Sequence, residues 1–129
     1  MKKLSRTFAV LALVCAFVGI SMMNVSAAST SFGGKAGYGY EKVSSPNIKA
    51  DSNNLAYVNW TYSDQNSHKM WFKVCKNGYT DSLGKALVNY QSSDYITTSG
   101  TVKGGSYVLY AGREHVVNPE TYVSGTWES

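Results

Sequence analysis

The middle of the chain alternates between apolar and polar side chains with a period of two. The alternation is clearest over residues 55–62 and 68–76, and it is typical of half-buried β-strands. The apolar positions that share a face are Ala56, Val58, Trp60 and Tyr62 in the first segment, and Met70, Phe72 and Val74 in the second. A polar segment, residues 63–67, separates them, so the pattern predicts a β-hairpin.

Shorter strand-like segments follow, with turn residues about every ten positions. They cover residues 85–90, 94–98, 106–111 and 121–127, the last interrupted at Gly125. Residues 28–54 are rich in glycine, serine and asparagine, and we interpret them as mostly irregular with one possible strand at 38–43. The chain is thus expected to be all-β, a small antiparallel β-sandwich or barrel of six to seven strands with its core in residues 55–129.

The first 27 residues follow a different pattern. Three basic side chains lie among the first six residues, an apolar run covers residues 8–20, and small residues follow. These are the three parts of a secretory signal peptide. The run is too short for a spanning helix, which needs about 20 residues, and Cys15 comes too early for a lipoprotein cleavage site. We expect a signal peptide helix over residues 1–27, cleavage after Ala27 or Ala28, a secreted domain and no stable membrane insertion after cleavage.

Removal of this segment changes the charge. The chain has 12 lysine and arginine residues and 8 acidic ones; three of the basic residues and none of the acidic ones lie in the first 27 positions. The mature chain is therefore almost neutral, with its charges interspersed. This argues against nucleic-acid binding and against a polybasic contact with an anionic membrane.

Cys75 is the only cysteine after the signal peptide, which excludes an intrachain disulfide. The alternation puts it on the face of Trp71 and Lys73. Since Trp71 calls for burial, we expect another sheet to cover this face and the thiol to be inert, in a monomeric protein. An open face would instead give a mixed disulfide or a covalent dimer. Nothing in the spacing to His68 or His115 supports a cysteine nucleophile.

The densest charged group is Arg113-Glu114-His115, which follows a strand-like segment. Loops at strand ends collect binding residues, so Tyr110, Arg113, Glu114 and His115 are the candidate binding residues, for a carboxylate or a carbohydrate. The alternative is a solvated loop whose charges pair with other surface charges. No catalytic residue is assigned. No metal or cofactor is expected, since two distant histidines and an incomplete set of loop oxygens match neither zinc nor calcium sites.

All ten tyrosines lie after residue 27, which is more than one core of this size can hold. Tyrosine is enriched at binding surfaces. Cross-strand pairing on a solvated sheet explains exposed tyrosines equally well. Both interpretations stay open.

The C-terminal segment carries a resemblance. A strand leads into Arg113-Glu114-His115, then an Asn118-Pro119 turn, then Val-Ser-Gly-Thr-Trp at residues 123–127. This resembles the closing segment of an uncharacterised family of small exported proteins from Gram-positive bacteria, a domain of unknown function. The resemblance implies an exported β domain and assigns no catalytic residue. Gly33-Gly34 and the Gly-Tyr-Gly of residues 37–39 are similar, over less of the chain, to lactococcin-like bacteriocins.

These features predict a secreted, non-catalytic domain that binds an extracellular protein or a cell-envelope component. A bacteriocin-like antibacterial protein, or an accessory of a bacteriocin system, is the alternative. A small secreted hydrolase that uses His115 with Glu114 is a weaker one.

Overall fold

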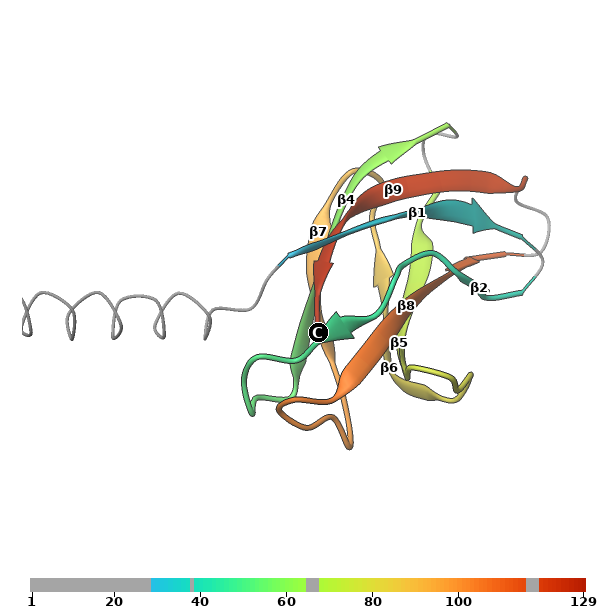
Figure 1. Cartoon of the computed structure of the whole chain (residues 1–129). Coiled ribbons are helices and arrows are strands. Elements are labelled where there is room, and N and C mark those ends of the chain that lie inside the picture. The colour runs from blue at the N-terminus through green and yellow to red at the C-terminus, as the bar shows by residue number, and fades with distance from the viewer. Residues whose placement is uncertain (1–28, 38, 65–67, 116–118) are drawn as a thin grey trace, which may run out of the picture.

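The computed structural model describes residues 29–37, 39–64, 68–115 and 119–129, which form two antiparallel sheets and no helix (Figure 1). One sheet has four strands, in the order β1 (Thr30–Ala36), β9 (Thr121–Glu128), β4 (Leu55–Ser63) and β7 (Ser93–Thr97). The other has five: β2 (Glu41–Lys42), β8 (Ser106–Arg113), β5 (Met70–Lys76) and β6 (Ser82–Val88) in that order, with β3 (Asn47–Ile48) also paired to β8. The expected all-β sandwich is confirmed. The expected signal peptide and its cleavage site lie outside the described residues.

The core lies between the two sheets and is built from the predicted alternation. Every predicted apolar position of residues 55–60 and 70–74 is buried. Phe72 of β5 lies at the centre: its ring centroid is 5.5 Å from that of Phe32 in β1 and 5.9 Å from that of Trp60 in β4, both in edge-on geometry. Three rings from opposite sheets thus interlock, an arrangement in which aromatic pairs contribute beyond their buried area.

The predicted hairpin is wrong. β4 pairs with β7 and β9 in the four-stranded sheet, whereas β5 pairs with β6 and β8 in the five-stranded one. A hairpin would turn both apolar faces to the same side of one sheet. Placing the two strands in opposite sheets lets the apolar faces cover each other across the core, which buries more apolar surface.

The N-terminal part is more regular than expected. β1 pairs with β9 over seven residues, from Thr30 opposite Trp127 to Ala36 opposite Thr121. Two further two-residue strands bring the described total to nine, above the six to seven predicted. Phe32, Ala36 and Val43 belong to the core, so the core begins at β1 and not at residue 55. Glycines at positions 33 and 34 hide the alternation of β1 because they carry no side chain.

Strand β4 contains an irregularity between Trp60 and Tyr62, where its register against β9 shifts. After this point Tyr62 faces solvent, 51 % exposed, and Ser63 is buried. The expectation that Tyr62 shares the apolar face of Trp60 is therefore wrong, because a β-bulge changes which residues face inward. The indole Nε1 of Trp60 donates a hydrogen bond of 2.7 Å to the carbonyl of Tyr62 across the bulge.

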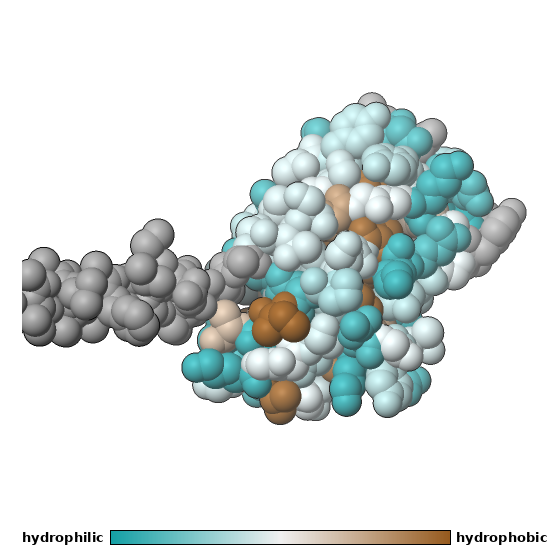
Figure 2. Space-filling model, in the orientation of Figure 1, coloured by the Kyte–Doolittle hydropathy of each residue, from teal (hydrophilic) through white to brown (hydrophobic). Residues whose placement is uncertain are grey.

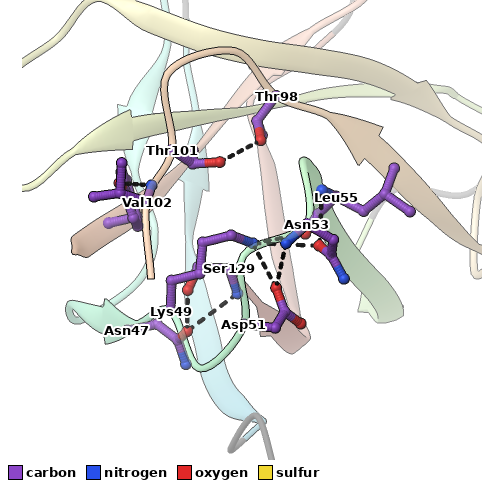
Figure 3. A network of polar contacts seen from close by, with 10 residues as sticks. Asn47, Lys49, Asp51, Asn53, Leu55, Thr98, Thr101, Val102 and Ser129 are labelled. Carbon is purple, nitrogen blue, oxygen red and sulfur yellow. Dashed lines mark hydrogen bonds and ion pairs between the residues drawn. The ribbon is translucent and has the colours of Figure 1, made fainter. Parts of the chain in front are cut away.

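A polar network closes one end of the sandwich (Figure 3). The buried side chain of Lys49 forms an ion pair with Asp51, Nζ to Oδ1 3.2 Å, and donates to the carbonyl of Leu55 at 3.2 Å. The Asn47 side chain accepts hydrogen bonds from the backbone N–H and the hydroxyl of Ser129. Its amide also donates to the hydroxyl of Thr30 at 2.6 Å. Buried polar groups need such partners, and the network ties the start of β1 to the end of β9.

Candidate functional site

Arg113, the last residue of β8, is used within the fold. Its Nε donates a 2.7 Å hydrogen bond to the carbonyl of Gly37, in the segment between β1 and β2. The side chain is half-buried, and the alternation of β8 puts it on the inward side of Leu109 and Ala111. Tyr110 lies on the opposite side. The structure therefore does not bring Arg113 and Tyr110 together on one surface, although both are candidate binding residues in the sequence.

Glu114 and His115 follow β8 and pair with each other, with 3.6 Å between His115 Nε2 and Glu114 Oε1. The His115 side chain is 65 % exposed. The thiol of Cys75 is far from them: Cys75 is opposite Val108 in the β5–β8 register, and Arg113 lies five residues further along β8, roughly 17 Å away. The described residues thus do not supply a cysteine nucleophile to His115.

A set of lysine and aromatic side chains covers the outer face of the five-stranded sheet. Lys73 of β5 is opposite Tyr110 of β8 on one side and Lys85 of β6 on the other, and Tyr110 is opposite Lys42 of β2. Four neighbouring strands therefore present one row of side chains. Together with Tyr40 and Trp71, which lie beside this row, we call this surface the lysine–aromatic face: Tyr40, Lys42, Trp71, Lys73, Lys85 and Tyr110.

Two of the three lysines of this face, Lys73 and Lys85, are held against aromatic rings. Lys73 Nζ lies 4.4 Å from the ring centroid of Tyr40 and 5.3 Å from that of Tyr110, and it donates to the carbonyl of Thr80 at 3.0 Å. Lys85 Nζ lies 4.7 Å from the centroid of Trp71. An ammonium group within about 6 Å of a ring centroid is attracted by the ring quadrupole. The side chains of Lys73 and Lys85 are therefore held in place before any ligand arrives.

Gly112 makes room for Tyr40. The glycine is buried, and a Cβ at this position would lie 2.8 Å from Cδ1 of the Tyr40 ring. Absence of a side chain thus lets the ring rest on the sheet, where Lys73 reaches it. Burial raises the pKa of the Tyr40 hydroxyl above its ordinary value of 10.0, so this ring stays neutral at physiological pH.

The fold separates charges that are interspersed along the chain. The strands of the five-stranded sheet contain Lys42, Lys73, Lys76, Lys85 and Arg113 against Glu41. The strands of the four-stranded sheet contain Lys35 against Asp94 and Glu128. Neither of the two ion pairs found in the described part of the chain includes a lysine of the lysine–aromatic face. A nearly neutral domain thus carries a positive surface on one sheet.

The outer face of the four-stranded sheet is lined by tyrosines instead. Tyr57 and Tyr95 are directly opposite each other, with ring centroids 5.1 Å apart, and Tyr62 contacts Tyr122 at 6.4 Å. These are cross-strand pairs on a solvated sheet, one of the two interpretations that the sequence left open. The side of the molecule in Figure 2 is mainly hydrophilic, with only small, separated hydrophobic areas.

Cys75 is fully buried, as expected, but not for the expected reason. The thiol donates to the carbonyl of Thr80 at 3.6 Å, in the connection between β5 and β6. Among the described strands, no second sheet covers this outer face. Its neighbours on the same face, Trp71 and Lys73, remain partly exposed. Burial raises the pKa of the thiol above its ordinary value of 9.0; Lys73 lowers the pKa and Asp81 raises it.

A thiol reagent should modify native Cys75 at least about 100-fold more slowly than the unfolded chain, since access needs a local opening that costs about 3 kcal/mol.

The folded state holds the thiol proton more tightly than the unfolded state. The free energy of unfolding should therefore decline as pH rises above about 9, and Cys75→Ala should make this decline shallower. Reagent kinetics and urea unfolding at pH 7 to 10 measure both. Rapid labelling at pH 7, or a dimer band that reductant removes, would contradict burial of the thiol.

Among the described residues, no three histidine, cysteine or acidic side chains gather where they could hold a metal ion. Over the same ranges, no helix is both long and apolar enough to cross a bilayer. The chain matches no protein-family model, and neither a curated protein nor a solved structure matches it.

Proposed function

We propose that this chain is an exported, non-catalytic domain that binds an extracellular protein or a cell-envelope component through its lysine–aromatic face. The observation that carries the proposal is this row of side chains across four strands, in which Lys73 contacts both Tyr40 and Tyr110. Export is the expectation from the signal peptide pattern of the first 27 residues. Tyr110 is the residue that the sequence analysis and the lysine–aromatic face have in common.

Pre-ordering supports a binding role. Association costs free energy for every flexible side chain that it immobilises, about 0.5–1.5 kcal/mol each. The contacts of Lys73 and Lys85 with aromatic rings meet part of this cost in the free protein. Aromatic side chains are also enriched in binding interfaces, where they combine large contact area with a polar group.

The proposal is tested by retention of residues 28–129 on envelope fractions of the source organism. We expect the unmodified domain to be retained, and Trp71→Ala with Tyr110→Ala to reduce retention at least about tenfold, the loss that two interface aromatics commonly cause. The matched control is Tyr95→Ala with Tyr122→Ala on the other sheet, which should leave retention unchanged. Circular dichroism shows that each variant is folded. Equal loss in both pairs, or no retention of the unmodified domain, would refute a role for this face.

A further inference from the structure

We infer that the ligand of the lysine–aromatic face is a linear acidic polysaccharide. This inference rests on the proposed function and names its ligand class. It begins with two like charges: Lys73 and Lys85 are directly opposite each other in the register of β5 and β6. Like charges in this position destabilise a sheet. Acidic groups of a ligand placed between or above these two ammonium groups would remove the repulsion, so the free face is complementary to negative charge.

The geometry of the row favours a linear ligand. Lys42, Tyr110, Lys73 and Lys85 follow one another across β2, β8, β5 and β6. Three strand spacings separate the first from the last, roughly 14 Å. A polymer that crosses the strands would meet three ammonium groups in succession, with the Tyr110 side chain between the first two. Acidic groups repeated along a sugar chain suit the lysines, and sugar hydroxyls suit the phenol group of Tyr110 as hydrogen-bond partners.

The same contacts argue against two other polyanions. Single-stranded nucleic acids bind by stacking bases on open aromatic faces, whereas the ammonium groups of Lys73 and Lys85 lie over the rings of Tyr40 and Trp71.

Membrane surfaces are bound by apolar side chains that enter the interface. None of the strongly exposed large apolar side chains of the described residues belongs to the lysine–aromatic face, although Ile48 lies opposite Ser106 on the same sheet. They are Ile48, Leu55, Tyr62, Tyr79, Tyr95, Val102 and Tyr122.

Calorimetric titration of residues 28–129 with sodium alginate, a linear polyuronate, tests the inference, with uncharged dextran as the comparison. We expect alginate to bind and dextran not to bind. Affinity should fall as salt rises, because bound lysines release counterions from a polyanion. Lys42→Gln with Lys85→Gln should weaken binding about tenfold and reduce the slope of log affinity against log salt by about two, one for each lysine removed.

Lys35→Gln with Lys103→Gln is the matched control. It removes the same charge from two exposed lysines outside the face and should change affinity less than twofold. Equal weakening by both pairs would show attraction to net charge alone and overturn the inference. If the double variant unfolds, Lys42→Gln alone tests whether the row binds alginate. Lys42 lies on a two-residue strand.

Two further outcomes would also overturn the inference. One is binding to vesicles of anionic phospholipid without binding to alginate. The other is retention on envelope fractions, sensitive to Trp71→Ala with Tyr110→Ala, in a protein that does not bind alginate. The second outcome would leave the proposed function standing and remove only the ligand class.

Discussion

Gly125→Ala is expected to destabilise the domain by about 3 kcal/mol, toward the upper end of what overpacking costs. A Cβ at this position would collide with the backbone carbonyl of Asn59 in β4 and approach the ring of Phe32. Neither neighbour can yield easily, because Asn59 belongs to the β4–β9 pairing and Phe32 to the core. The melting temperature should fall by about 15 °C, given a shift of 4–8 °C per kcal/mol in a domain of this size.

Thermal unfolding followed by circular dichroism measures this effect. The control is Gly39→Ala, because nothing lies within 4 Å of a Cβ added there. Its effect should stay within about 0.5 kcal/mol, as for most surface substitutions. Similar melting temperatures for the two variants would show that β4 and β9 do not approach as closely as described.

Phe72→Ala is expected to cost 3–5 kcal/mol, the range for removing a buried phenylalanine. The side chain is fully buried and contacts Phe32 and Trp60 of the opposite sheet. Its loss would remove both edge-on contacts and leave a cavity where the sheets meet. Since small domains have only about 5–15 kcal/mol of stability, the variant should be near the limit of folding.

Urea unfolding measures this loss as a lower midpoint at unchanged slope. Tyr95→Ala is the comparison: this ring is 61 % exposed and contacts Tyr57, so its removal should cost no more than about 1 kcal/mol. An equal loss in the two variants would argue that the rings around Phe72 do not carry the packing between the sheets.

The sequence was informative where packing repeats along one strand. Alternation over residues 55–60 and 70–74 correctly predicts which side chains are buried, because successive side chains of a strand point to opposite faces of the sheet. It could not predict the partner of each strand, and the close spacing of β4 and β5 suggested a hairpin that does not form. Gly125 interrupts the apolar pattern but not the strand, because a glycine at this position lets the backbones of β9 and β4 approach closely.

The candidate site shows a stronger limit. Lys73 and Lys85 lie on consecutive strands, but Lys42 is 31 positions before Lys73, and it joins them only because β2 and β5 both pair with β8. The net charge of the mature chain is a sum over both sheets. A nearly neutral sum therefore does not reveal that one sheet is positive. Its charge and its position at the end of a strand make Arg113 a candidate binding residue, but its hydrogen bond to Gly37 depends on a segment 76 residues away.

The pairing of β1 with β9 affects how the chain can acquire its structure. β1 and β9 are the first and last strands of the described residues, so the four-stranded sheet cannot be completed before residues 121–128 have been synthesised. Pairings between distant segments also form slowly, since a long loop must close before any contact compensates for it. A chain with this topology is therefore expected to fold slowly, which would suit the export that we propose, because a translocation channel accepts unfolded chains.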